Sequence, residues 1–192
     1  MEFNVFAAVL CDKVWNTCNS AFHSGTLIEA RRLPQWWNPR PGRIRVFTDA
    51  AFKNNGGGAA DMVVLNNASQ ILRLAAQCFK ADSLLEAELL ALKFGVESCT
   101  VLNWTNVVFF SDNLEVVNSI TSSSCPVWSL LHLSLSICDV SRMLNYSVVW
   151  IPRTLNGSAH VLASWAFKHN HSGTFAWWEV ATFVTTNLLC SS

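Results

Sequence analysis

Hydrophobic residues follow two different patterns along this chain, and the change between them lies near residue 42. Before that point Phe6, Val9, Leu10 and Val14 recur at helical spacing. Residues 31–42 then hold three prolines and a glycine, which is typical of a linker. We therefore predict a helical N-terminal extension with a Pro/Trp/Arg-rich linker over 1–42, an α/β domain over 43–170 and a C-terminal tail over 171–192.

Strand patterns dominate the first part of the predicted domain. Residues 44–49, 60–65 and 71–79 are rich in aliphatic and β-branched side chains. Turns rich in Asn and Gly separate them at 54–58 and 66–67. Three consecutive strands joined by short turns predict an antiparallel meander.

Helices and strands alternate in the rest of the domain. A capping box of Ser83 and Glu86 predicts the start of a helix. The elements expected after it are a buried strand at 106–111, a helix at 114–120, a helix from Pro126 that carries Leu130, Leu133, Ile137 and Met143, a strand at 147–151 and a helix capped by Asn156 that ends near 169. Strands separated by helices pair in parallel through crossovers. The pattern thus predicts a mixed five-stranded sheet, an antiparallel three-strand meander plus two parallel strands, flanked by helices.

Composition narrows the class of protein. Hydrophobic residues make up 51% of the 192 positions, charged residues make up 14%, and the formal net charge is +0. These values exclude a disordered chain and exclude nucleic-acid binding by bulk positive charge. The seven cysteines are dispersed without a C-x-x-C pair, and the sequence lacks a signal-peptide pattern and a long apolar run. We expect an intracellular protein of the nucleus or cytoplasm, not secreted, with no membrane partner.

Three acidic residues fall where the predicted fold would bring them together. Asp49 ends the first strand and Asp112 ends the fourth, and ligands of open α/β sheets bind beyond such strand ends. Glu88 lies on the sheet side of its helix, whereas Glu86 is needed for the cap. Each acid alone also fits a turn, a cap or a solvated face. Together they would repel one another strongly, and a hard divalent cation such as Mg²⁺ would relieve that repulsion.

These segments resemble the ribonuclease H fold, and more narrowly the plant retrotransposon-derived ribonuclease H-like domains, also called reverse-transcriptase-like domains. The matching segments appear in family order over about residues 40–168: PRPG (39–42), TDAAF (48–52), GGG (56–58), LEAELLAL (85–92), FSDN (110–113), VWIPR (149–153) and NGSAHVLA (156–163). The resemblance implies cleavage of the RNA strand of an RNA–DNA hybrid with two Mg²⁺ or Mn²⁺ ions.

The resemblance also implies roles for particular residues. Asp49, Glu88 and Asp112 would be catalytic metal ligands, with Asp49 bridging both ions. The fourth acidic position of well-characterised ribonucleases H is His160 here. Imidazole is a softer ligand that suits Zn or Mn better than Mg. His160 therefore stands as a catalytic candidate, either as a ligand or as a proton shuttle, and the alternative is that it covers the helix N-terminus.

Two further positions depart from active ribonucleases H. The loop at 152–155 lacks the histidine that those enzymes often carry before the last helix, and the Glu helix is preceded by Ala81 and Asp82 without an asparagine. Discrimination between a hybrid and other duplexes depends on 2′-hydroxyl contacts, so the substrate preference stays open.

Substrate contacts would come from polar and basic side chains near the acids. The candidates are Lys53, Asn54, Asn55, Arg153 and Asn156. A second basic group, interleaved with Trp36 and Trp37, consists of Arg31, Arg32, Arg40, Arg43 and Arg45. Such a group can bind single strands by stacking, although the prolines favour a linker that packs its tryptophans on the domain.

Three functions fit these residues. The first is a metal-dependent ribonuclease H-like endonuclease, acting as a monomer on RNA–DNA hybrids. The alternative is a catalytically weak or inactive nucleic-acid-binding module derived from a retroelement, which His160 and the missing loop histidine favour. An exonuclease or integrase-like enzyme on the same fold is the third, because a fold does not determine function.

Overall fold

The computed structural model describes residues 42–54, 56–67, 70–141 and 145–175. In chain order the elements are β1 (Ile44–Phe52), β2 (Gly57–Leu65), β3 (Ile71–Lys80), α2 (Leu84–Val101), β4 (Val107–Ser111), α3 (Leu114–Thr121), the 3-10 turn η2 (Trp128–Leu130), α4 (Leu131–Ser141), β5 (Tyr146–Trp150), the 3-10 turn η3 (Arg153–Leu155), α5 (Gly157–His169) and β6 (Gly173–Thr174). The predicted helix before residue 31, the linker up to 41, Asn55, Met143 and residues 176–192 lie outside the described part of the chain.

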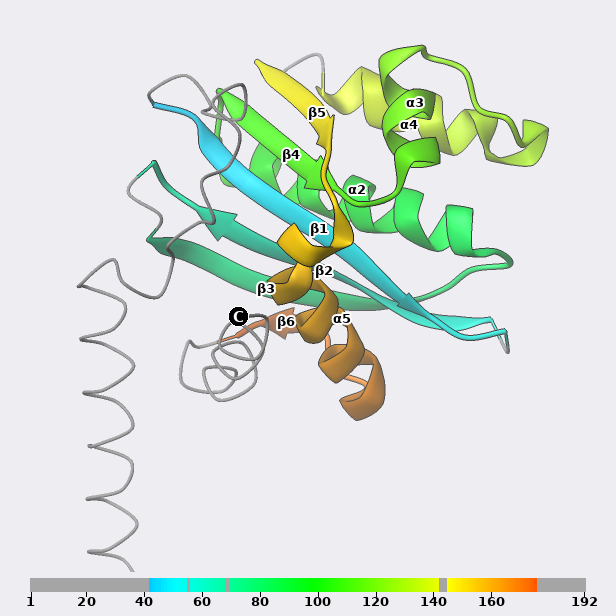
Figure 1. Cartoon of the computed structure of the whole chain (residues 1–192), viewed down its shortest axis with the longest axis horizontal. Coiled ribbons are helices and arrows are strands. Elements are labelled where there is room, and N and C mark those ends of the chain that lie inside the picture. Colours follow the sequence, from blue (N-terminus) through cyan, green and yellow to red (C-terminus); the bar gives the residue numbers. More distant parts are fainter. Residues whose placement is uncertain (1–41, 55, 68–69, 142–144, 176–192) are drawn as a thin grey trace, which may run out of the picture.

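The strands form one mixed sheet in the order β5-β4-β1-β2-β3-β6 (Figure 1). β1, β2 and β3 pair antiparallel, while β4 pairs in parallel with β1 and β5. The α/β class and the meander plus two parallel strands are therefore confirmed. The sheet has a sixth strand, because β6 pairs with Ala75 and Ala76 of β3. β6 has two residues, too few to show a strand period in the sequence.

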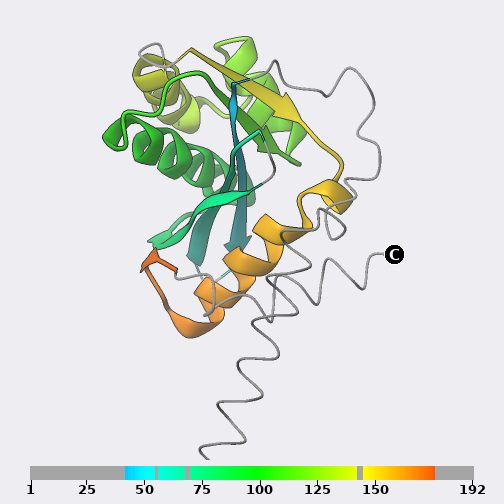
Figure 2. The same ribbon diagram turned by 90° about the vertical axis from the view of Figure 1, so that its left-hand side faces the viewer.

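Helices cover both faces of the sheet (Figure 2). The larger core lies under α2, α3 and α4, where Leu89, Leu92 and Val96 pack with Val46 and Met62. On the other face α5 contributes the buried Ala159, Leu162 and Ala166 to a core with Ala59, Val63 and Leu74. Because successive side chains of a strand point to opposite faces, alternate residues of β1 face α2 and the residues between them face α5.

Local contacts at α2 bring this helix close to β1. The Ser83 hydroxyl accepts a hydrogen bond from the Glu86 N–H at 3.2 Å, as the capping box predicts. The Glu86 carboxylate reaches one residue further back than expected and accepts from the Asp82 N–H at 2.7 Å. Further along, a Cβ added at Gly95 would meet Cγ2 of Thr48 at 2.9 Å, so the missing side chain permits a close helix–strand approach.

Two predicted helix starts are wrong in detail. The helix expected from Pro126 begins with the 3-10 turn at Trp128, and α4 itself starts at Leu131. No side-chain cap hydrogen bond forms at the start of that turn. Asn156 precedes α5 as expected, but its side chain makes no capping bond. Its amide instead turns inward, where two acceptor oxygens from other elements lie within reach.

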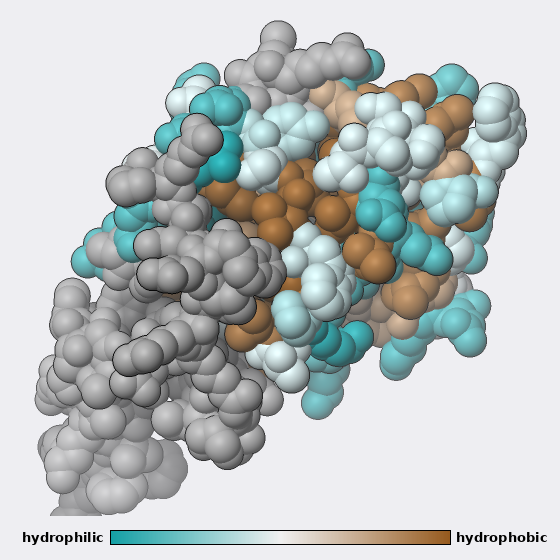
Figure 3. Space-filling model, turned by 45° about the horizontal axis from the view of Figure 1, so that its top comes forward, coloured by the Kyte–Doolittle hydropathy of each residue, from teal (hydrophilic) through white to brown (hydrophobic). Residues whose placement is uncertain are grey.

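Hydrophobic side chains reach the surface between polar ones on the face that Figure 3 presents, which fits a chain with few charged residues. The largest exposed hydrophobic side chains of the described part are those of Leu72, Leu84, Val101, Leu114, Val127, Trp128, Leu135 and Trp150. Among the described residues, no helix combines the length and the hydropathy needed to cross a bilayer.

Candidate metal centre

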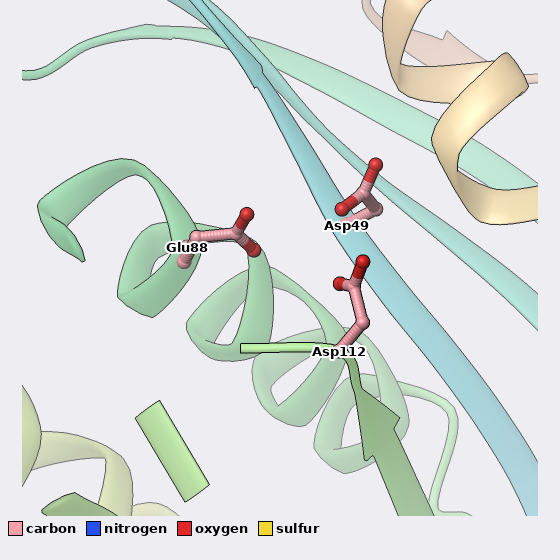
Figure 4. Close-up of side chains that lie close together, drawn as sticks. All are labelled: Asp49, Glu88 and Asp112. Carbon is pink, nitrogen blue, oxygen red and sulfur yellow. The ribbon is translucent and has the colours of Figure 1, made fainter. Parts of the chain in front are cut away.

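Three carboxylates from three elements meet where β4 ends. Asp49 lies on β1, Glu88 on α2 and Asp112 directly after β4, and their side chains point toward one another (Figure 4). One oxygen from each forms a set in which all atoms lie within 4.8 Å of one another. The prediction that Asp49 ends its strand is wrong, because β1 continues to Phe52 through its pairing with β2, but the parallel pairing of β1 with β4 ends at Phe47, before Asp49. We refer to Asp49, Glu88 and Asp112 below as the acidic triad.

Burial and mutual repulsion disfavour negative charge in the acidic triad. Asp49 is 2% exposed and Glu88 is 8% exposed. Burial is the main cause that raises the pKa of both carboxyl groups, and the charge of Asp112 raises both further. A cation placed among these oxygens would replace lost hydration and offset the repulsion.

The donor set fits a hard divalent cation. All three side chains present carboxylate oxygen, which Mg²⁺ and Mn²⁺ prefer over nitrogen or sulfur ligands. Asp49 also contacts His160, and Asp112 accepts a hydrogen bond from Asn156. The residues that the sequence predicts as metal ligands are therefore brought together, which is the geometry that such a site requires.

His160 lies beside the triad on the first turn of α5. Its Nδ1 is 2.8 Å from Oδ2 of Asp49, and its side chain is 38% exposed. Nη2 of Arg153 lies 3.2 Å from Nδ1 and 3.1 Å from Nε2 of the same ring. His160 thus contacts the triad residue Asp49 directly.

Asn156 joins the elements that carry the triad. Its Nδ2 donates to the carbonyl oxygen of Thr48 at 3.0 Å and to Oδ1 of Asp112 at 3.2 Å. The residue is fully buried, so its amide cannot reach a strand on the surface. Both contacts of the Asn156 amide are therefore inside the domain, whereas the sequence predicts a substrate contact at this residue.

Trp150 adds a second contact to Asp112. The indole Nε1 donates to the Asp112 carbonyl oxygen at 3.0 Å, while 41% of the residue stays exposed at the end of β5. An exposed aromatic ring beside the centre is a surface on which a nucleobase can stack. Sequence reasoning placed Trp150 only in a matching segment and gave it no role.

A further buried acid, which the sequence analysis missed, lies next to Asp49. Asp61 on β2 pairs with Asp49 across the strands, is fully buried and accepts a hydrogen bond from the Asp49 N–H at 3.0 Å. Burial raises the pKa of Asp61 well above its ordinary value, and the charge of Asp49 adds to the effect. The sequence signal that could have identified Asp61 is an acid within a strand that otherwise contains only Gly, Ala, Met, Val and Leu.

Two other residues that the sequence predicts as substrate contacts, Lys53 and Asn54, lie on the surface. Lys53 and Asn54 are exposed on the turn between β1 and β2, and the Lys53 ammonium sits 5.2 Å from the ring centre of Phe167. Arg43 donates to the side chains of Asn106 and Ser147. Arg45 donates to the Asn66 carbonyl oxygen. The two described arginines of the basic group therefore make contacts within the domain.

Solved structures with a similar fold include ribonucleases H. The RNase H1 of the archaeon Halobacterium salinarum is 20% identical with a TM-score of 0.62, and the alignment covers 67% of this chain and 99% of that one. The N-terminal RNase H domain of a Mycobacterium tuberculosis protein is 22% identical with a TM-score of 0.59, covering 67% and 95%. LC11-RNase H1 from compost, solved with an RNA/DNA hybrid, is 18% identical with a TM-score of 0.60, covering 67% and 99%. At these identities the likeness shows the ribonuclease H-like fold.

The family comparison covers the same part of the chain. A search of curated proteins finds no match. The model of the reverse transcriptase-like family matches residues 47–166, a range that holds the whole acidic triad together with Asp61, Asn156 and His160. That range is more than half of the chain, and we conclude that this protein belongs to the reverse transcriptase-like family, on a ribonuclease H-like fold.

Proposed function

We propose that this protein is a divalent-metal-dependent nuclease that cleaves the RNA strand of RNA–DNA hybrids. The observation that carries the proposal is the convergence of Asp49, Glu88 and Asp112 within 4.8 Å, with Asp49 and Glu88 buried. A purely structural cluster of this kind would be costly, because carboxyl groups that lack a cation lose hydration and repel one another. The hybrid substrate is supported by the similar fold of LC11-RNase H1, which was solved with an RNA/DNA hybrid.

The residues of the centre would divide the work of phosphodiester hydrolysis. The acidic triad would hold Mg²⁺ or Mn²⁺, and the bound ion supplies Lewis-acid chemistry at a phosphate and lowers the pKa of water. The exposed Arg153 lies beside the centre and can pair with a phosphate oxygen of the strand. Asn156 donates a hydrogen bond to the Asp112 carboxylate, and Trp150 donates one to the Asp112 carbonyl oxygen. These bonds would keep the carboxylate in the orientation that binds an ion.

A cleavage assay tests this function directly. The full chain is incubated with a labelled RNA–DNA hybrid in a series of Mg²⁺ and Mn²⁺ concentrations, and the RNA products are resolved on a gel. We expect metal-dependent cutting by the wild type and loss of cutting in Asp49→Asn and Asp112→Asn. The matched control is Asp139→Asn, which changes an exposed carboxylate on α4 and should cut normally. Full activity in Asp49→Asn would exclude the residue assignment.

The second candidate function is hybrid binding without cleavage. It is favoured by His160, which occupies the fourth position of the centre with both ring nitrogens in contact with other side chains. This function predicts hybrid binding in EDTA, measured by fluorescence anisotropy, and no cutting in any divalent metal. Cutting by the wild type in Mg²⁺ or Mn²⁺ would exclude it.

A further inference from the structure

Two of the six oxygens of the acidic triad are already engaged on the α5 side. Oδ2 of Asp49 contacts Nδ1 of His160 at 2.8 Å, and Oδ1 of Asp112 accepts from the Asn156 amide at 3.2 Å. The remaining oxygen of each Asp is left to act with Glu88, which reaches the centre from the opposite face of the sheet. On the α5 side of the centre, one oxygen of each Asp is therefore already in contact with a side chain. The other oxygens lie on the side of Glu88.

The imidazole of His160 is held between Asp49 and Arg153. Its Nδ1 lies 2.8 Å from Oδ2 of Asp49, so this ring nitrogen is engaged by the carboxylate. Nη2 of Arg153 lies 3.2 Å from Nδ1 and 3.1 Å from Nε2, and a nitrogen almost equidistant from both ring nitrogens must lie over the face of the ring. The carboxylate contact and the guanidinium thus fix the imidazole on the α5 side of the centre.

Arg153 also brings positive charge to the same side. While burial raises the pKa of Asp49 and Glu88, the charge of Arg153 acts in the opposite direction on both carboxyl groups. The guanidinium thus already supplies part of the stabilisation that a cation would give. A second divalent ion beside it would meet like charge at short range.

We propose that the centre holds a single divalent cation, bound by Glu88 and by one oxygen from each of Asp49 and Asp112, and that His160 with Arg153 occupies the place where a second ion would bind. This inference rests on the proposed metal-dependent function and departs from the two ions that the family resemblance implies. It concerns the number of ions, which can be measured without any assay of cleavage.

The test is a count of Mn²⁺ ions on the full chain. Free Mn²⁺ is quantified by electron paramagnetic resonance while the metal is titrated into wild type, His160→Asp and His132→Asp. We expect one ion per wild-type chain and two per His160→Asp chain, because a carboxylate at position 160 supplies a hard oxygen ligand. His132 is exposed on α4, so His132→Asp is the matched control and should bind one ion.

A second readout examines the ligands of the bound ion. Pulsed electron paramagnetic resonance of the wild type at one Mn²⁺ per chain should show no nitrogen hyperfine coupling from a directly bound imidazole. Such a coupling, if it disappeared in His160→Asp, would overturn the proposal by making His160 a ligand.

Each stoichiometry has a distinct meaning. Two ions on the wild type would overturn the single-ion proposal and leave the proposed nuclease function intact. One ion on both wild type and His160→Asp would overturn the role of His160 in excluding the second. No ion on the wild type would contradict the metal-dependent function itself. The wild-type count needs no variant, so the proposal is tested even where His160→Asp does not fold.

Discussion

The N–H of Asp49 donates a hydrogen bond to Oδ1 of Asp61, 3.0 Å away on the neighbouring strand, so one buried acid holds the backbone of another. Oδ2 of Asp61 is buried without a hydrogen-bond partner among the described residues. Both side chains share the face of the sheet that α5 covers. A carboxyl group in this position is stable only when it is neutral, because ionisation would place an uncompensated charge beside Asp49.

Asp61→Asn should therefore reduce the pH dependence of stability. In the unfolded chain an Asp side chain has a pKa of about 3.9. Burial raises the pKa of Asp61 in the folded protein, so the unfolded chain releases this proton first as the pH rises. The stability that Asp61 contributes is complete below about pH 4 and is lost toward neutral pH. Urea unfolding of metal-free protein from about pH 4 to about pH 7 should show a smaller loss in Asp61→Asn.

The control for this experiment is Asp139→Asn, which removes an exposed carboxyl group of the same type. Equal slopes for wild type and Asp61→Asn would contradict the placement of a titrating acid in the core of the fold.

Substitution of Glu86 should change stability and substitution of Glu88 should change metal binding, although the two residues are only two positions apart on α2. Glu86→Ala removes the acceptor of the Asp82 N–H and should lower the free energy of unfolding by about 1 kcal/mol with Mn²⁺ affinity unchanged. Glu88→Gln removes a ligand and should weaken Mn²⁺ binding by at least about tenfold without loss of stability in EDTA. Chemical denaturation and Mn²⁺ titration of both variants check this pair. The opposite assignment of effects would exchange the roles of the two residues.

Divalent metal should stabilise the folded chain. The triad exists only in the folded state, and ligand at about 100 times its dissociation constant adds about 2.7 kcal/mol to the free energy of unfolding. The midpoint of thermal unfolding should rise in MgCl₂ relative to EDTA at matched ionic strength. The rise should be absent in Asp112→Asn, which keeps two of the three carboxylates. An equal rise in that variant would place the stabilising ion elsewhere.

Gly95→Ala should disturb the approach of α2 to β1. The added methyl group would meet Thr48 at 2.9 Å and Phe109 at 3.4 Å, and overpacking of this kind costs about 1–3 kcal/mol. Because Glu88 lies on the same helix, Mn²⁺ affinity should fall together with stability. Gly157→Ala is the matched control, since a Cβ at Gly157 meets nothing within 4 Å. Equal unfolding midpoints for the two variants would contradict this packing.

The sequence predicts the acidic triad because each member follows from local pattern. Asp49 and Asp112 follow runs of strand residues, and Glu88 lies on the apolar side of a periodic helix. The order of strands and helices then gives the sheet neighbours, since parallel pairing needs a crossover. The convergence of the three side chains confirms the part of the prediction that depends on fold alone.

Local sequence patterns do not predict the contacts that distinguish this centre. The inward turn of Asn156 depends on Thr48 and Asp112, which are 108 and 44 positions away along the chain. The position of the His160 ring depends on Asp49, 111 positions away along the chain, and on the rotamer of Arg153. Long-range hydrogen bonds of this kind compete with local capping, and the sequence around position 156 shows only the local option.

The bonds of Asn156 also tie the centre to the pairing of β1 with β4. A shift of one residue between two strands turns every side chain to the other face, which would remove Asp112 from the reach of the amide and from the triad. The cation site therefore exists in a single register of the sheet. Divalent metal, by binding only that arrangement, would select correctly paired molecules from a refolding mixture.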